Sequence, residues 1–149
     1  MTYKNIMVAI DGSNTSNLAL QEAIQLTKDQ KANLRIIHVV DENFVNYGET
    51  YIDYDALSAS CREEGQKILN KMEEIARQSN VKFESQLVEL KPFEGRIAEK
   101  IVDETKKWPA DLLIIGTHGR RGFNHLILGS VAEGVIRIAT TPVLLIRGK

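Results

Sequence analysis

The stretch that decides the fold is residues 112–139, which read LLIIGTHGRRGFNHLILGSVAEGVIRIA. It opens with the unbroken apolar run 112–115, as expected of a strand covered on both faces of a sheet. Gly116 and Gly119 follow, and after nine further residues comes Gly129-Ser130. From there the apolar residues recur at helical spacing. The segment is therefore predicted to run from a strand through a glycine-rich loop into a helix.

Such a loop has the chemistry of an anion site. Glycines lack a Cβ, so the backbone can take a positive φ and approach a ligand closely. Successive loop N–H groups can form a concave nest, and the first turn of the next helix offers free donors and a positive dipole end. In a simpler interpretation, Gly116 only ends a strand, and Ser130 with Glu133 forms a capping box. The complete spacing Gly-x2-Gly-x9-Gly-Ser between strand and helix favours the anion site.

Residues 116–131 resemble the nucleotide-binding loop of the universal stress protein family, in the ATP-binding branch whose pattern is G-x2-G-x9-G-[S/T]. The resemblance extends to IMVAIDGS at 6–13, HVVD at 38–41 and TPVLLI at 141–146, and so covers essentially the whole chain. It implies one universal stress protein domain over residues 1–149. The implied fold is a three-layer α/β/α, Rossmann-like structure of the adenine nucleotide alpha hydrolase type. Its five-stranded parallel sheet has the order 3-2-1-4-5.

Composition limits the function classes. A chain of 149 residues fits one domain, and 43% apolar with 26% charged residues is typical of a soluble globular protein. The formal net charge of −1 gives no electrostatic reason to expect nucleic acid or a membrane surface as partner. No signal peptide or membrane-length run is evident. Cys61 is the single cysteine, so no intrachain disulfide forms, and a cytoplasmic location is expected.

The rest of the chain alternates strands with helices, which favours one parallel sheet wrapped on both faces. A turn at 11–14 is expected to cap the first helix. In the helix at 56–79, Gly65 interrupts the apolar pattern and predicts a close contact. Pro92 is expected to start the next helix with Phe93 facing inward, and Trp108-Pro109 to stop it. The strands are predicted at 4–10, 34–40, 81–90, 112–115 and 143–147. The buried stripe of helix 56–79 is predicted to comprise Leu57, Cys61, Ile68, Met72, Ile75 and Ala76.

The binding crevice of an open α/β sheet lies beyond the carboxyl ends of the strands, where the strand order reverses. In the implied order this point lies between the first and fourth strands, which lead into Asp11 and Gly116. Taken alone, Asp11 is better interpreted as a helix cap. The nucleotide-binding residues implied by the resemblance are Ala9, Asp11, Val39, Ile115, Gly116, Gly119, Gly129, Ser130, Val131 and Ala132.

The resemblance also implies roles. The backbone N–H groups of Gly119, Gly129, Ser130 and Val131 bind phosphates, together with the Ser130 hydroxyl. Asp11 accepts from ribose or holds a magnesium-bound water, and the Val39 backbone reads adenine. Ala9 and Ile115 supply apolar contact. Ala132 stands where some ATP-binding members have a hydroxyl residue, which leaves one phosphate contact open.

Five other side chains near these segments have less specific interpretations. Arg120 and Arg121 either neutralise phosphate or face solvent. His38 is expected to be a satisfied strand histidine. His118 and His125 lack partners at metal-ligand spacing, so no direct metal site is predicted.

The function expected is that of an ATP-binding universal stress protein, with magnesium as the companion ion, that acts through occupancy in a stress response. One alternative is a slow ATP-hydrolysing enzyme, although the chain has neither Gly-x4-Gly-Lys-[Ser/Thr] nor a Gly-x-Ser-x-Gly elbow, and no catalytic residue is predicted. Another is a dimerising module without nucleotide, against which the intact glycine pattern argues.

The last strand predicts how the chain assembles. Its apolar run would invite pairing if it forms the sheet edge, unless a helix hides it. The family pairs this edge with its copy in a second subunit, which implies a homodimer. The predicted dimer edge comprises Pro142, Val143, Leu144, Leu145 and Ile146.

Overall fold

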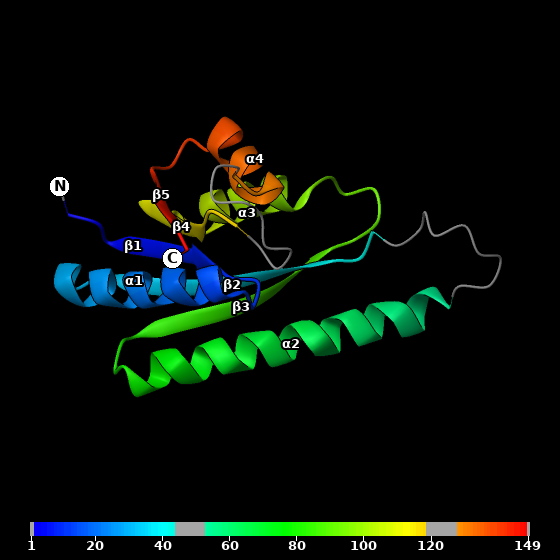
Figure 1. Ribbon diagram of the computed structural model, residues 1–149, viewed down its shortest axis with the longest axis horizontal. Coiled ribbons are helices and arrows are strands. Elements are labelled where there is room, and N and C mark those ends of the chain that lie inside the picture. The colour runs from blue at the N-terminus through cyan, green and yellow to red at the C-terminus, as the bar shows by residue number, and fades with distance from the viewer. Residues whose placement is uncertain (1, 44–52, 119–127, 149) are drawn as a thin grey trace.

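The computed structural model describes residues 2–43, 53–118 and 128–148. In this part of the chain five parallel strands form one sheet of order β3-β2-β1-β4-β5, as Figure 1 shows. The predicted architecture and strand order are confirmed. The strands are β1 (Asn5–Ala9), β2 (Asn33–Asp41), β3 (Phe83–Leu90), β4 (Leu112–Gly116) and β5 (Val143–Ile146).

Helices cover both faces of this sheet. One apolar core joins the sheet to α1 (Asn14–Gln30) and α2 (Tyr54–Gln78), and a second joins it to α3 (Ile97–Lys107) and α4 (Ser130–Ile138). In β1, Ile6 and Val8 belong to the first core, whereas Met7 and Ala9 belong to the second. This explains why the central strands read as continuous apolar runs, because both of their faces are buried.

The register brings the carboxyl ends of the central strands to one edge of the sheet. Ala9 of β1 pairs with Ile37 of β2 and with Ile115 of β4. Ladder bonding continues beyond β1, since the Ile10 N–H donates to the Ile37 carbonyl oxygen at 2.9 Å. Residues that follow β1 and β4 are thus held side by side, where the strand order reverses.

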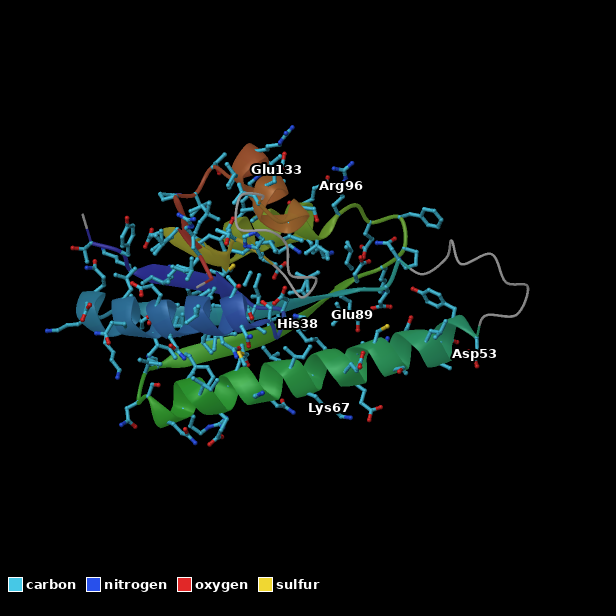
Figure 2. The ribbon with its side chains drawn as sticks, in the orientation of Figure 1. His38, Asp53, Lys67, Glu89, Arg96 and Glu133 are labelled. Atoms are coloured by element: carbon cyan, nitrogen blue, oxygen red, sulfur yellow. The ribbon has the colours of Figure 1, made fainter. Side chains whose placement is uncertain are left out.

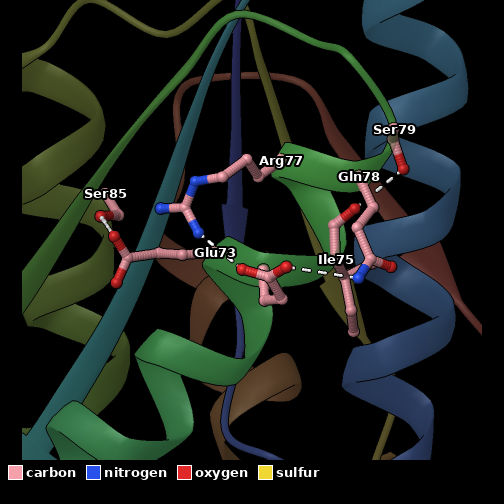
Figure 3. Close-up of polar contacts among 7 residues, drawn as sticks. Glu73, Ile75, Arg77, Gln78, Ser79 and Ser85 are labelled. Carbon is pink, nitrogen blue, oxygen red and sulfur yellow. Dashed lines mark hydrogen bonds and ion pairs between the residues drawn. The ribbon is translucent and has the colours of Figure 1, made fainter.

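Helix α2 packs against β2 and β3 more closely than a side chain would permit at one position. A Cβ on Gly65 would lie 2.5 Å from Val40 Cγ2 and 3.1 Å from Leu87 Cδ1, which confirms the close contact predicted there. At the end of α2, the Ser85 hydroxyl of β3 donates to Glu73 Oε2 at 2.9 Å (Figure 3). The Ser79 hydroxyl donates to the Ile75 carbonyl oxygen at 2.9 Å, also drawn there.

The predicted buried stripe of α2 is wrong at its N-terminal end. Leu57 is 40% exposed, whereas Leu69, which the prediction left out, is only 2% exposed. In Figure 1 the first turns of α2 lie away from α1 and the body of the sheet, so an apolar residue there has little to pack against. Hydrophobic periodicity alone does not reveal where a long helix extends beyond the sheet on which it packs.

Helix α3 begins at Ile97 rather than at Pro92. Phe93 and Gly95 both have positive φ, 68° and 103°, which no right-handed helix allows, and Phe93 is 90% exposed rather than facing inward. The Lys91 N–H donates to Glu94 Oε1 at 2.8 Å, so this segment is a hydrogen-bonded turn. The predicted stop is confirmed, since α3 ends at Lys107, just before Trp108-Pro109.

Candidate functional site

A cavity of about 550 Å³ opens at the carboxyl edge of the sheet. Its walls come from the ends of β1, β2 and β4 and from one side each of α2, α3 and α4. This is the point between β1 and β4 where the strand order reverses, which is where open α/β sheets bind ligands. The volume falls within the range of about 300–1,000 Å³ that small-molecule sites occupy.

Most of the residues that the sequence assigned to the nucleotide lie on these walls. They are Ala9, Asp11, Val39, Ile115, Gly116, Ser130, Val131 and Ala132. Gly119 lies outside the described residues, as do Arg120, Arg121 and His125. The structure thus brings together side chains and backbone from three strands and one helix that are widely separated in the sequence.

Gly129 differs from its expected role as a phosphate donor. It is buried, and its N–H donates to the Thr117 carbonyl oxygen at 2.8 Å. That amide is therefore already used in this structure. The bond ties the residue before α4 to the residue after β4, and so closes the base of the glycine loop.

The first turn of α4 leaves amides free of helical partners. Gly129 is the N-cap, and the first helical bond runs from the Glu133 N–H to the Gly129 carbonyl oxygen at 2.9 Å. The amides of residues 130–132 precede that bond, and their residues line the cavity. A turn of this kind attracts anions, because unpaired N–H groups and the positive end of the helix dipole point the same way.

The simpler interpretation of Ser130 and Glu133 as a capping box is wrong. Ser130 is the first helical residue rather than the cap, and no side chain caps α4. Glu133 instead accepts a hydrogen bond from Arg137 Nη2 at 2.8 Å, one turn further along the helix. The absence of a capping side chain leaves the first turn open toward the cavity.

Asp11 follows β1 and forms part of a tight turn. Its Oδ1 accepts from the Ser13 N–H at 2.9 Å, and Ser13 caps α1 by accepting from the Ser16 N–H at 3.1 Å. Gly12 between them has a φ of 85°, which suits glycine. Asp11 therefore shapes the start of α1 and also lines the cavity.

Gly116 is required for packing rather than for a positive φ. Among the described glycines, positive φ occurs at Gly12 and Gly95 and not at Gly116. A Cβ on Gly116 would lie 2.7 Å from Thr15 Cγ2 and 3.3 Å from the Thr15 carbonyl carbon. The expectation of a positive φ at this glycine is therefore wrong. It lets the first turn of α1 lie against the end of β4.

Sequence reasoning missed the contribution of α2 to the cavity. Cys61, Glu64, Gly65 and Ile68 all line it. Their spacing marks one face of a helix, on which the sequence predicts Cys61 and Ile68 only as buried core residues. Gly65 was the one available signal, because a helical glycine indicates that something approaches closely. From α3, Ile97 and Ile101 add apolar wall.

His38 of β2 also lines the cavity, on the side of the sheet that faces α2 (Figure 2). Its Nδ1 lies 2.7 Å from the Ile10 carbonyl oxygen, so this nitrogen carries the hydrogen and donates. The residue is 7% exposed. The expectation of a satisfied strand histidine is confirmed.

The charged side chains in the cavity wall are acidic. Asp11, Asp41 and Glu64 contribute carboxylates, and the described part of the wall contains no Lys or Arg. Burial raises the pKa of the Cys61 thiol, and the carboxylates of Glu42, Glu64 and Asp41 raise it further. Within the described part of the wall, an anionic ligand would thus find its hydrogen-bond donors in backbone amides rather than in Lys or Arg side chains.

Two further findings concern the described ranges 2–43, 53–118 and 128–148. No group of three or more His, Cys, Asp or Glu side chains there is arranged to hold a metal ion. None of the helices in these ranges combines the length and apolarity that crossing a bilayer requires.

Known proteins with similar sequences and structures were compared with this chain. A universal stress protein of Methanocaldococcus jannaschii is 36% identical over 146 residues, which covers 97% of this chain and 82% of that protein. A solved structure from the universal stress protein family of Burkholderia pseudomallei has a TM-score of 0.77 at 34% identity. The match covers 97% of this chain and 96% of that one.

Two more distant solved structures share the fold and hold ligands. A universal stress protein from Archaeoglobus fulgidus in complex with dAMP has a TM-score of 0.65 at 24% identity, over 98% of this chain and 99% of that one. A universal stress protein in complex with cAMP has a TM-score of 0.66 at 24% identity, over 99% of this chain and 98% of that one. The family model described as "Universal stress protein family" matches residues 2–147, and the chain therefore belongs to that family.

Proposed function

We propose that this protein binds an adenine nucleotide in the cavity at the carboxyl edge of the sheet, with ATP and Mg²⁺ as its ligands. It would act in the cytoplasm as a regulatory protein of the stress response that signals through occupancy. One observation carries the proposal. The uncapped first turn of α4 opens onto a cavity of about 550 Å³ at the switch point of the sheet.

The walls suit the three parts of a nucleotide. The free amides of residues 130–132 suit phosphate oxygens, and Asp11 suits ribose hydroxyls or a magnesium-bound water. The end of β2 at Val39 offers backbone groups to a base, with Ala9 and Ile115 as apolar neighbours. These assignments rest on the resemblance together with the placement of the residues.

The acidic wall supports magnesium as the companion of ATP. A triphosphate beside three carboxylates meets repulsion that the described wall offsets with no Lys or Arg. A divalent cation that coordinates the phosphates reduces this repulsion. We therefore expect ATP to bind more tightly with magnesium than with EDTA, whereas adenosine binding should not depend on the metal.

The choice of adenine is supported by the two distant members of the fold that hold dAMP and cAMP. Both ligands carry adenine and a phosphate, so this fold can accommodate that combination. Mass spectrometry of the purified protein after denaturation would identify any nucleotide that it carries. A phosphate-release assay would distinguish a binder from the alternative of slow ATP hydrolysis.

A proline substitution at Ser130 tests the phosphate end of the cavity. Proline is well tolerated at the first helical position, and Gly129 has the extended backbone that precedes proline, with φ −64° and ψ 154°. Ser130→Pro therefore removes one amide donor and one hydroxyl while α4 is kept. The matched control is Ser130→Ala, which removes only the hydroxyl.

We expect Ser130→Pro to weaken ATP binding by tenfold or more, because a hydrogen bond to a charged group contributes about 1.5–3 kcal/mol. Calorimetric titration of ATP with magnesium measures this. Wild-type affinity in Ser130→Pro, with circular dichroism showing an intact fold, would exclude the proposed phosphate position.

The proposal includes a homodimer formed through β5. This strand pairs with β4 on one side and forms the edge of the sheet, with all four of its residues half-buried. Pro142 just before it is exposed, and Ile136 and Ile138 on α4 are each 44% exposed. An apolar edge with exposed apolar neighbours is the kind of surface that a second copy would cover.

A further inference from the structure

The imidazole of His118 is a polar group in the cavity wall that the proposed roles leave unused. His118 follows Thr117 at the end of β4 and lines the cavity. Its Nδ1 lies 2.9 Å from the Thr117 hydroxyl oxygen. Its Nε2 is buried and has no hydrogen-bond partner among the described residues. A buried nitrogen in this condition is unfavourable, and a ligand atom can satisfy it.

The backbone holds His118 beside the first turn of α4. The Thr117 N–H donates to the Ile146 carbonyl oxygen at 2.9 Å, and the Thr117 carbonyl oxygen accepts from the Gly129 N–H at 2.8 Å. Thr117 is thus fastened both to β5 and to the residue that caps α4, and it is 4% exposed. His118 and residues 130–132 all line the cavity, and the bond between Thr117 and Gly129 joins the residues that immediately precede them.

The bond to Thr117 bears on which nitrogen carries the hydrogen. A neutral imidazole has one N–H, so when the Thr117 hydroxyl donates to Nδ1 the hydrogen resides on Nε2. His118 then presents a donor in a wall whose charged groups are Asp11, Asp41 and Glu64. A donor of this kind suits an anionic oxygen, and the only anionic part of an adenine nucleotide is its phosphate.

We infer that His118 is a phosphate-binding residue whose Nε2 donates to a phosphate oxygen of the bound nucleotide. This inference rests on the proposed function and adds a side chain to a site otherwise built from backbone amides. The side chain of His118 lines the cavity, so a small shift of the ring that keeps the bond to Thr117 would bring the buried Nε2 to a ligand. In this proposal Thr117 is a positioning residue, whose hydroxyl donates to Nδ1 and so leaves the hydrogen of the imidazole on Nε2.

The test compares ligands that differ in phosphate. Adenosine, AMP and ATP with magnesium are titrated calorimetrically into the wild type, His118→Phe and His118→Gln. Phenylalanine keeps a ring without a donor, whereas glutamine keeps a donor near the place of Nε2. We expect His118→Phe to lose about tenfold in affinity for AMP and ATP, adenosine affinity to stay within about twofold, and His118→Gln to recover most of the loss.

A spectroscopic measurement separates contact from a merely structural role. The ¹⁵N shifts of the histidine rings report the tautomer and are assigned to His118 by their loss in His118→Gln. We expect Nε2 to carry the hydrogen and its resonance to move with AMP but not with adenosine. Thr117→Val should mix the tautomers and weaken AMP binding less than His118→Phe does.

The outcomes are distinguishable. If the wild type binds AMP and ATP and His118→Phe binds them equally well, the inference fails and the proposed function stands. Equal losses for adenosine and AMP would show a structural role and would also overturn the inference. If the wild type binds none of the three ligands, the proposed function fails and the inference fails with it.

Discussion

Gly65 shows how one missing side chain sets the distance between a helix and the sheet. Because a Cβ would lie 2.5 Å from Val40 Cγ2, Gly65→Ala must displace either the Val40 side chain or α2 itself. We expect the free energy of unfolding to fall by about 1–3 kcal/mol, as overpacked cores do. At an unobstructed helical position the same change would stabilise by about 0.4–1 kcal/mol, so the sign is diagnostic. Urea unfolding measures it.

Ser60→Ala is the matched control, since Ser60 is exposed on the same helix. Alanine there slightly favours the helix and touches no core residue. A gain in stability for Gly65→Ala would contradict the close approach of α2.

The reactivity of the Cys61 thiol depends on the carboxylates around it in the cavity wall. The thiolate is the reactive form, and burial together with Glu42, Glu64 and Asp41 raises the pKa of the thiol. The fraction of thiolate near neutral pH is therefore lower than in an ordinary thiol, and alkylation by iodoacetamide should be slow and accelerate only at higher pH. Glu64→Gln should move the rate profile to lower pH.

Glu63→Gln provides the control for this measurement, because Glu63 is exposed and does not contribute to the shift. Magnesium and ATP should slow alkylation of the wild type, since Cys61 lines the cavity. If alkylation of Cys61 had the same pH dependence in Glu64→Gln and Glu63→Gln, Glu64 would have no effect on the pKa of the thiol.

At the scale of elements, two serines that look alike in sequence stand at different helix positions. The Ser13 side chain accepts from the Ser16 N–H at 3.1 Å and caps α1, whereas Ser130 lies inside the first turn of α4. Ser13→Ala should lower the free energy of unfolding by about 1 kcal/mol, while Ser130→Ala should leave it nearly unchanged. Thermal and urea unfolding of both variants provide the comparison, and equal losses would contradict the assigned caps.

At the scale of the whole molecule, the proposed homodimer depends on the open edge of the sheet at β5. The Pro142 and Ile146 carbonyl oxygens accept from β4, so the alternating residues Val143 and Leu145 direct their backbone groups to the free edge. Val143→Pro removes one outward N–H without touching the β4 ladder, and Val143→Ala is the control that keeps it. Sedimentation at micromolar concentration should show dimers for the wild type and Val143→Ala, and monomers for Val143→Pro.

A wild type that sediments only as a monomer would exclude the homodimer. Monomers in both variants would indicate that the Val143 side chain, rather than strand pairing, forms the contact. Either result leaves the fold of the subunit unaffected, because the β4 ladder supports β5 from the inner side.

Local sequence patterns predict much of the secondary structure of this protein. Residues 112–115 and 6–9 are apolar on both faces because each strand is covered by helices on both sides. Trp108-Pro109 ends α3 because the residue before proline avoids the helical conformation. Once the strand order was implied, the position of the cavity followed, since parallel strands all end at the same edge.

The features that the sequence did not predict depend on residues that are distant along the chain. Gly116 reads as a loop glycine, yet Thr15 is the residue that excludes its side chain. Cys61 and Ile68 read as part of a buried stripe, yet their side of α2 closes a cavity together with β1 and α4. Phe93 reads as a buried aromatic, yet the turn around Glu94 and Gly95 exposes it.

The sequence by itself determined the elements, their parallel arrangement and the edge at which a ligand would bind, because hydrophobic periodicity and turn residues act over short spans. The tertiary structure alone decided which amides remain free at α4, why Gly116 has no side chain and which helices wall the cavity. These features arise from contacts between segments that are brought together by folding. A local sequence pattern does not determine how closely two such segments approach each other.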